Sequence, residues 1–296
     1  MTLTHSKNGI TNSLSTVNVD KLLTPKKILF YTRLQTSFMN KYALITGASK
    51  GIGKAMANSL ARSGYHLLLI ARNETELQLL SQSIEQAYQV KAHYLSADLS
   101  LSTAANQVKE WCTGITPDLS ILINNAGYGL WGNFELLSLP EQLNMLRLNI
   151  DAVIELTWHL LPILRKQKQS YILNVSSTAA YQAVPTLALY AASKSFILSY
   201  SRALRYELKD SPVSVSCLCP GPTATGFSSR AGMDSLAELA EKFNMTSENV
   251  ANTGLNGMFK KKAEIVPGFL NKVSVFGTWI LPKSLIESIT AGLYKQ

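Results

Sequence analysis

Short apolar runs alternate with longer amphipathic stretches from residue 41 to about residue 222. The runs contain many β-branched residues and are apolar on both faces, which is typical of parallel strands covered by helices on both sides. They predict strands at Tyr42–Thr46, His66–Ala71, Lys91–Ser96, Ser120–Ile123, Tyr171–Ser176 and Val213–Cys217. The amphipathic stretches predict helices at about Gly51–Ser63, Glu74–Tyr88, Thr103–Thr113, Pro140–Arg165 and Leu187–Lys209.

This alternation predicts an α/β fold, a doubly wound parallel sheet with helices on both faces, in a single domain of residues 39–296. The regular pattern ends after Pro222. Residues 223–256 are helix-prone and rich in Ser, Ala, Glu and Asn, and we expect them to act as a substrate lid. Residues 269–296 form an apolar and basic tail. Packing on its own domain is the simplest role for the tail; covering the substrate mouth, pairing with another subunit and touching a membrane surface are alternatives.

Residues 1–38 differ from the rest of the chain, because they show no helical or strand period and contain Asp20 as their only acid. We expect a disordered or loosely attached arm. Its five basic residues and one acid give it +4 of the net charge of +9. Two interpretations are open: a peptide for organelle import, or a start codon placed upstream of a true start at Met39. The single Arg and the weak amphipathic pattern favour the second.

Composition narrows the class of protein. The chain has 296 residues, of which 46% are hydrophobic, and a mean hydropathy of +0.07, yet no apolar run reaches the roughly 18 to 20 residues of a membrane span. Its three cysteines are too few for a disulfide framework and lack metal-site spacing, so we expect a reducing, cytoplasmic location and no metal. Only Lys260–Lys262 forms a basic cluster, which does not indicate a nucleic-acid partner.

A glycine-rich turn, Thr46–Gly53, joins the first predicted strand to the first predicted helix. Its glycines would let the backbone approach a pyrophosphate at the helix N-terminus, where free N–H groups and the helix dipole favour negative charge. The turn predicts the dinucleotide-binding residues Gly47, Ser49, Lys50, Gly51, Ile52 and Gly53.

The end of the second predicted strand indicates which dinucleotide is bound. An acid that would bind the adenosine ribose is absent there, and Arg72 and Asn73 follow the strand instead. Arg72 and Lys50, with Ser49 beside them, would converge on a ribose 2′-phosphate. Arg72 alone would serve equally well as a solvated charge at a strand end. The three features together predict NADP(H) in preference to NAD(H).

Four motifs follow one another in a consistent order. They are the glycine turn, Asn-Asn-Ala-Gly at Asn124–Gly127, Tyr-Ala-Ala-Ser-Lys at Tyr190–Lys194, and Pro220–Gly221. With them, residues 41–225 resemble the short-chain dehydrogenase/reductase family, and the three-residue gap between Gly47 and Gly51 resembles its single-domain oxidoreductase branch. The resemblance implies a Rossmann-type sheet with strand order 3-2-1-4-5-6-7 and hydride transfer between a nicotinamide cofactor and a carbonyl or alcohol.

Hydride transfer to a carbonyl carbon also requires a proton at the carbonyl oxygen. Tyr190 and Lys194 stand four residues apart and therefore share one helix face, where the ammonium would make the phenol a better acid. On an ordinary helix the same pair would be a core Tyr and a solvated Lys. The preceding strand ends in Ser176 and Ser177, and because side chains alternate along a strand, only one hydroxyl can point into a site with Tyr190.

The resemblance assigns the remaining roles. It selects Ser177, thirteen residues before Tyr190, to hold the substrate oxygen, and leaves Ser176 satisfied within the sheet. It implies that Asn149 holds a water beside Lys194, whereas the residues alone would make Asn149 a helix irregularity. The implied cofactor contacts are Asp98 and Leu99 at the adenine, Asn125, Ala126 and Gly127 at the ribose, and Pro220, Gly221, Thr223 and Thr225 at the nicotinamide. Asp98 would serve equally well as a helix N-cap.

The candidates for a substrate pocket are largely apolar and favour a hydrophobic carbonyl or alcohol; they are Tyr128, Leu130, Trp131, residues 182–185, Met233 and Leu236. The resemblance weakens at Glu264–Gly268, where many family members carry a Val-Asp-Gly-Gly strand that builds tetramers. We therefore expect a homo-oligomer, a dimer rather than a tetramer. The motifs predict an NADPH-dependent oxidoreductase; the alternative is a non-catalytic NADP(H)-binding sensor, which would not need Tyr190 and Lys194.

Overall fold

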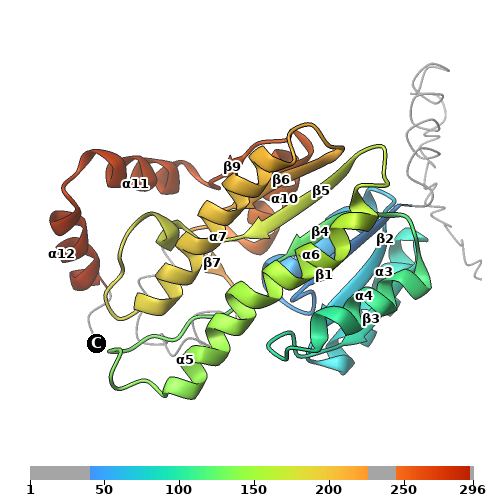
Figure 1. The fold of residues 1–296 in the computed structure, drawn as a ribbon, viewed down its shortest axis with the longest axis horizontal. Helices are drawn as coiled ribbons and strands as arrows, with labels where there is room; N and C mark the ends of the chain where they lie inside the picture. The colour runs from blue at the N-terminus through green and yellow to red at the C-terminus, as the bar shows by residue number, and fades with distance from the viewer. Residues whose placement is uncertain (1–40, 226–244, 294–296) are drawn as a thin grey trace, which may run out of the picture. The chain divides into compact units, whose positions relative to one another are not determined.

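The computed structural model describes residues 41–225 and 245–293. Its main sheet has seven parallel strands in the order β3-β2-β1-β4-β5-β6-β9 (Figure 1). The strands are β1 (Tyr42–Thr46), β2 (His66–Ala71), β3 (Ala92–Ser96), β4 (Leu119–Asn124), β5 (Ser170–Val175), β6 (Val213–Leu218) and β9 (Glu264–Ile265). The predicted fold class and the predicted strand order are confirmed.

Helices cover the sheet and form the core with it. They are α2 (Gly51–Arg62), α3 (Glu74–Tyr88), α4 (Ala104–Ile115), α5 (Leu139–Leu146), α6 (Ala152–Leu164), α7 (Ala188–Glu207) and α10 (Ser247–Phe259). Helix α2 packs against α3 and α10, and α4 packs against α6. Every residue of β1, β4 and β6 is buried, as expected for strands covered on both faces, whereas the edge strand β3 is only partly buried.

The helix predicted for Pro140–Arg165 is not regular. Between α5 and α6 the chain forms a π-helical segment, η2 (Arg147–Asp151), in which each turn carries an extra residue. Asn149 lies in this segment and is 1% exposed. Such segments are frequent at functional sites, and this one places a polar side chain where the apolar helical pattern alone would not.

The lid prediction for residues 223–256 is wrong over its C-terminal part. A small two-stranded sheet pairs β7 (Thr223–Ala224) with β8 (Met245–Thr246), and residues 226–244 lie outside the described residues. Residues 247–256 belong to α10, whose Gly254 lies against Leu218 of β6 and Met56 of α2. The buried stripe of this helix includes the small residues Ala251 and Gly254, and the rest of the helix is rich in Ser and Asn, so the composition did not indicate a core helix. The stripe is Val250, Ala251, Gly254, Leu255 and Met258.

The C-terminal tail forms two helices, α11 (Phe269–Ile280) and α12 (Lys283–Leu293). Val275, Ile286 and Thr290 are buried, and Thr290 Oγ1 lies 3.4 Å from the carbonyl oxygen of Ala183, the residue two after the short 3-10 helix η3 (Thr178–Tyr181). The tail therefore packs on its own domain through one face of each helix. Among the described residues, none of the helices has the length and apolar character to cross a bilayer. The arm predicted at residues 1–38 lies outside the described residues.

Candidate functional site

A cavity of about 1250 Å³ lies at the carboxyl ends of the strands of the main sheet. Ligands of doubly wound sheets bind at this edge. Among the sequence-predicted site residues, those that line the cavity are Gly47, Ser49, Lys50, Gly51, Ile52, Arg72, Asn73, Asp98, Leu99, Asn125, Ala126, Gly127, Ser177, Tyr190, Lys194, Pro220, Gly221, Thr223 and Thr225. Two others, Gly53 and Asn149, lie behind the wall and do not line it.

The glycine turn is held against the turn that follows β4. The φ angle of Gly47 is +64°, a backbone conformation that favours glycine, and a Cβ there would lie 2.8 Å from Asn125 Nδ2. That same amide nitrogen donates hydrogen bonds to the carbonyl oxygens of Thr46, at 2.9 Å, and Gly47, at 3.2 Å. Gly53 is a packing residue, because a Cβ there would overlap the carbonyl of Gly47. The turn thus presents the N-terminus of α2 to the cavity, a position suited to an anion.

A second group of polar residues, which we call the Lys50 corner, consists of Ser49, Lys50, Arg72 and Glu76. Lys50 Nζ lies 2.8 Å from Glu76 Oε1, and the Lys50 side chain is 70% exposed. The other carboxylate oxygen, Glu76 Oε2, is buried and accepts no hydrogen bond within the described residues. The corner therefore contains an acid as well as two cations.

Glu76 is not among the predicted site residues, because an acid was expected directly after β2 and Glu76 stands five residues beyond its end. Asn73 caps α3, since its Oδ1 accepts a hydrogen bond from the Glu76 backbone N–H at 3.1 Å. This cap starts the helix at Glu74 and brings the third residue of its first turn back over the cavity. An Asn followed three residues later by Glu resembles a capping box, and that pattern was the available signal.

Asp98 and Leu99 follow β3 along the cavity wall. Oδ1 of Asp98 accepts hydrogen bonds from the backbone N–H and the hydroxyl of Ser100, at 3.0 and 2.7 Å. Helix α4 begins six residues after Asp98, at Ala104, with Thr103 at its N-cap position. The helix-cap alternative for Asp98 is therefore wrong, and its contact with an adenine stays a prediction.

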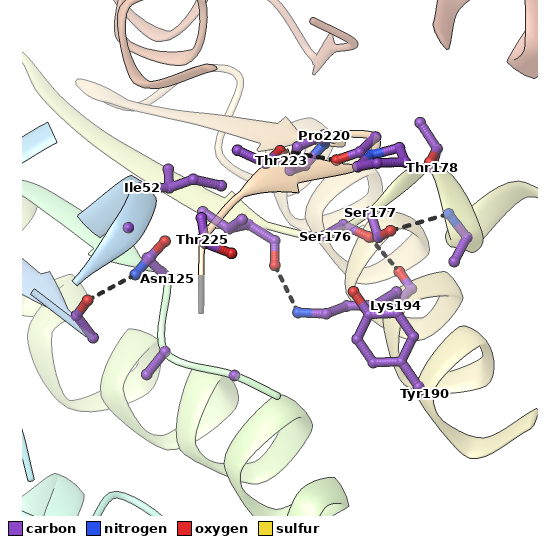
Figure 2. Close-up of a pocket in the computed structure, with 18 of the residues that line it drawn as sticks. Ile52, Asn125, Ser176, Ser177, Thr178, Tyr190, Lys194, Pro220, Thr223 and Thr225 are labelled. Atoms are coloured by element: carbon purple, nitrogen blue, oxygen red, sulfur yellow. Dashed lines mark hydrogen bonds between the residues drawn. The ribbon is translucent and has the colours of Figure 1, made fainter. Parts of the chain in front are cut away.

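The opposite end of the cavity, which we call the Tyr190 corner, is formed by Ser176 and Ser177 after β5 and by Tyr190 and Lys194 of α7 (Figure 2). Ser176 Oγ donates to the carbonyl oxygen of Lys194 at 2.7 Å and is buried. Its hydroxyl is satisfied, as expected, but by a helix backbone rather than within the sheet. Ser177 Oγ accepts a hydrogen bond from the backbone N–H of Ala179 at 3.1 Å, which leaves the Ser177 O–H for donation.

Lys194 is a buried cation beside an aromatic ring. Its Nζ donates to the carbonyl oxygen of Val175 at 3.0 Å and lies 5.8 Å from the centre of the Tyr190 ring. Burial lowers the pKa of Lys194 from 10.5 to about 8, against a smaller opposing effect of Cys217 and Cys219. At pH 7 the side chain is therefore still mostly charged, and its charge acts where water cannot screen it.

Asn149 acts on the wall of this corner from behind. Its Nδ2 donates to the carbonyl oxygen of Tyr128, at 2.9 Å, and to Ser193 Oγ, at 3.2 Å, while its Oδ1 accepts from the backbone N–H of Tyr128, at 3.2 Å. Gly127 separates it from the lysine, because a Cβ on Gly127 would lie 2.9 Å from Asn149 Oδ1 and 3.3 Å from Lys194 Nζ. Asn149 thus orients the turn after β4, and its contact with a water stays a prediction.

The segment after β6 forms a further wall of the cavity. Thr223 Oγ1 donates to the carbonyl oxygen of Gly221 at 2.9 Å, and the carbonyl oxygen of Pro220 accepts from the backbone N–H of Thr178 at 2.9 Å. Thr225 reaches the glycine turn, since a Cβ on Gly51 would lie 2.8 Å from Thr225 Cγ2. The turn predicted to hold the pyrophosphate and the segment predicted to hold the nicotinamide therefore lie side by side.

The expected substrate residues are only partly correct. Gln182 and Val184 line the cavity. Tyr128 and Trp131 do not line it, and Leu130 lines a separate cavity of about 90 Å³. Met233 and Leu236 lie outside the described residues. The wall that the sequence analysis missed comes from the tail helices, at Phe269, Leu270, Asn271, Ser274 and Leu293.

No cluster of His, Cys, Asp and Glu suited to a metal ion occurs in residues 41–225 and 245–293. Cys112, Cys217 and Cys219 are free thiols and buried. The polar groups of the cavity are instead hydroxyls, amides, one buried ammonium and four ionic groups that are exposed or partly buried, Lys50, Arg72, Glu76 and Asp98. Such a set can hold an organic anion at one end and exchange a proton at the other.

Comparisons with known proteins identify the family. A family model described as short chain dehydrogenase matches residues 41–236. The 17-beta-hydroxysteroid dehydrogenase type 3 of Mus musculus is 30% identical over 249 residues, 82% of this chain and 81% of that protein. The very-long-chain 3-oxoacyl-CoA reductase-B of Danio rerio is 32% identical over 199 residues, 66% of this chain and 63% of that protein. A solved short-chain dehydrogenase from Sphingobium yanoikuyae, in complex with NADPH, has a TM-score of 0.73 at 27% identity and covers 86% of this chain and 94% of that chain.

Proposed function

The chain belongs to the short-chain dehydrogenase/reductase family, and we propose that it uses NADPH to reduce the carbonyl group of an apolar substrate, with Tyr190 as general acid/base. It is an oxidoreductase acting on CH–OH or C=O groups. The observation that carries the proposal is the single cavity that contains the glycine turn, Ser177, Tyr190 and Lys194.

Each residue of the Tyr190 corner has a separate role in the proposed reaction. When bound, NADPH supplies a hydride to the carbonyl carbon. Ser177 donates its O–H to the carbonyl oxygen and fixes the substrate, and Tyr190 gives its phenolic proton to the same oxygen. Lys194 stabilises the phenolate that results, because its charge is buried beside the ring. In the oxidative direction the same groups act in reverse.

The Lys50 corner supports NADPH as the cofactor. Lys50 and Arg72 are both cations on the cavity wall, next to the hydroxyl of Ser49. A ribose 2′-phosphate is a dianion that such a pair would bind by charge-assisted hydrogen bonds. The ratio of kcat/KM with NADPH to kcat/KM with NADH measures the preference. A preference for NADH in the wild type that persists in Arg72→Asp would refute it.

The cavity walls support an apolar substrate. Val184, Phe269, Leu270 and Leu293 line the same cavity as Tyr190 and Gln182. Two of the relatives are named for a hydroxysteroid and for a very-long-chain 3-oxoacyl-CoA, and the steroid skeleton and the long acyl chain are both apolar. A panel of carbonyl compounds should show highest kcat/KM for apolar ketones. Turnover confined to small charged hydroxy acids would contradict this substrate class.

Replacement of Tyr190 by Phe tests the enzymatic role against the sensor alternative. The variant keeps the ring and loses the proton, so turnover should fall by roughly 10²- to 10⁴-fold. NADPH affinity, measured from the fluorescence of the bound nicotinamide, should change little. Thr75→Ser, at an exposed position on α3 outside the cavity, serves as control and should keep both properties. Unchanged turnover in Tyr190→Phe would favour a sensor.

We also propose that the chain is cytoplasmic and forms a homodimer. The dimer is supported by the absence of the Val-Asp-Gly-Gly pattern at Glu264–Gly268, where β9 contributes only two residues to the sheet edge. Sedimentation velocity at several protein concentrations gives the mass of the species in solution, and a tetramer would contradict the dimer.

A further inference from the structure

Large apolar side chains are concentrated on the outer faces of α11 and α12. Trp279 is 72% exposed and Phe276 is 66% exposed, so most of each side chain is in contact with solvent. We call the whole set the C-terminal apolar surface; its members are Phe269, Leu270, Val273, Phe276, Trp279, Ile280, Leu281, Leu285, Ile289 and Leu293. Contiguous exposed patches of this kind mark binding surfaces.

The spacing shows that each helix has two apolar faces. On α12, Leu285, Ile289 and Leu293 recur every four residues and are exposed, whereas Ile286 and Thr290, each one residue further on, are buried. The inner face packs on the domain and the outer face has no cover within the described residues. On α11 the exposed stripe recurs at intervals of four, three and four residues, at Phe269, Val273, Phe276 and Ile280.

The charges of the two helices favour a lipid surface over a second copy of this chain. Within residues 269–293, Lys272 and Lys283 are basic and Glu287 is the only acid. A two-fold pairing of this surface would bring like charges together, whereas anionic headgroups complement them. Lys272 and Lys283 are both exposed. A lysine at a membrane surface can extend its ammonium to the headgroup level while its stem lies among acyl chains, and Trp is enriched at that depth.

The C-terminal apolar surface is continuous with the cavity. Phe269, Leu270 and Leu293 belong to both, since each lines the cavity and is at least half exposed. In Figure 1, α11 and α12 lie at one end of the described domain, beyond the helices that cover the sheet. An apolar molecule dissolved in a bilayer would therefore reach the cavity mouth without first entering water. This step rests on the proposed function, in which the cavity binds an apolar substrate.

We propose that the outer faces of α11 and α12 bind the surface of an anionic phospholipid bilayer and open the cavity towards it. The two helices lie in the interface, with the apolar stripe at the level of the headgroups and upper acyl chains. Attachment depends on buried apolar area and on attraction between the lysines and anionic lipids, so it weakens with added salt.

Vesicle sedimentation tests the proposal. The full chain is spun with vesicles of phosphatidylcholine alone or with about three parts in ten phosphatidylglycerol. We expect the wild type to bind the anionic vesicles, the double variant Phe276→Ser/Trp279→Ser to lose at least tenfold in partition coefficient, and Trp158→Ser to bind like the wild type. Trp158 is a matched control, because it is also 72% exposed but lies on α6. Equal binding by the wild type and the double variant would overturn the proposal, and so would no binding by the wild type.

Two further measurements separate the possible failures. Phospholipids brominated on the acyl chains should quench the tryptophan fluorescence of the wild type more strongly than that of Trp279→Phe, because the other three tryptophans of the chain lie outside α11 and α12. Neither Phe276 nor Trp279 lines the cavity, so kcat with a small water-soluble ketone should be the same in the double variant and the wild type. Vesicle binding without any turnover would refute the proposed function but not the proposal that the C-terminal apolar surface binds lipid. If the double substitution instead halves the mass in solution and the wild type ignores vesicles, the surface pairs two copies and the lipid proposal fails.

Discussion

The two ends of the cavity hold their cations in opposite ways. In the Tyr190 corner, Lys194 is 6% exposed and bonded to a backbone carbonyl, so its partners are set by the packing of β5 against α7. In the Lys50 corner, the Lys50 side chain is 70% exposed and paired with the carboxylate of Glu76. A buried charge acts at nearly full strength on one neighbour, whereas an exposed ion pair is screened and exchanges partners with water. The proton chemistry therefore depends on the fold, while cofactor choice depends on a few surface charges.

The largest effect should come from removing the buried cation. Lys194→Met should lower the reductive kcat/KM by roughly 10²- to 10⁴-fold, because the phenolate of Tyr190 loses its only neighbouring buried charge among the described residues. Lys54→Met is the control, and it should retain full activity. Lys54 is an exposed residue of α2, the helix that follows the glycine turn, and it does not line the cavity. If Lys194→Met kept a tenth of the activity, the buried charge of Lys194 would not be the main contribution of the Tyr190 corner to catalysis.

At the exposed end, Arg72→Ala should weaken NADPH binding by roughly 10- to 100-fold, the loss expected for charge-assisted hydrogen bonds to a phosphate. NADH binding should hardly change, since NADH lacks that phosphate. Titration of cofactor fluorescence gives both dissociation constants. Arg62→Ala, at the far end of α2, removes the same charge outside the cavity and should affect neither constant. Equal weakening of both cofactors would show that Arg72 does not recognise the 2′-phosphate.

Raising the pH should change the activity and the stability of the protein in opposite directions through Lys194. Burial lowers the pKa of Lys194 to about 8, so the reductive kcat/KM should fall by about tenfold per pH unit above pH 8 as the ammonium loses its proton. Between about pH 8 and the ordinary value of 10.5 the unfolded chain binds more protons at this group than the folded chain, so the contribution of Lys194 to the free energy of unfolding rises with pH. Urea unfolding of the wild type and of Lys194→Met at pH 8 and pH 10 isolates that contribution. A kcat/KM that stays flat to pH 10 would contradict the lowered pKa.

The smallest effect is expected at Glu76. Glu76→Gln frees Lys50 from its partner and removes a negative charge from the Lys50 corner, so the ratio of NADPH to NADH efficiency should rise by roughly two- to fivefold, the scale of an exposed ion pair. Glu74→Gln is a matched control, because Glu74 stands in the same first turn of α3 but does not line the cavity. A fall in the ratio would mean that Glu76 supports the phosphate site through Lys50 instead of competing with it.

The sequence predicted those parts of the molecule whose signals are local. The strands have buried apolar runs, and Tyr190 and Lys194 need only a helix to share a face, so both follow from neighbouring residues. Two expectations failed because they depended on contacts between distant segments. Ser176 is satisfied by the backbone of α7, and α10 is buried because it meets α2, and no local pattern specifies either partner.

The missed residues have a common physical cause. Glu76 reaches the cavity because Asn73 starts a helix that turns its third residue back over the strand end. The wall formed by the tail begins at Gly268, the N-cap residue of α11, whose φ angle of +83° sets the direction in which the helix starts. In both cases a turn of defined geometry carries a side chain to a place that its position in the sequence does not reveal. Short capping and turn patterns are thus the signals that deserve most weight near a predicted site.

The π-helical segment Arg147–Asp151 has a consequence for the helix that follows it. An α-helix advances about 100° per residue, so one extra residue in a turn rotates everything after it by that angle. The segment therefore sets the phase of α6, whose Leu156, Leu160 and Leu164 all point into the core. Deleting one residue here would turn that apolar stripe away from α4 and at the same time move the amide of Asn149 off the turn at Tyr128. The same five residues therefore determine both how α6 packs in the core and where the Asn149 amide lies at the site.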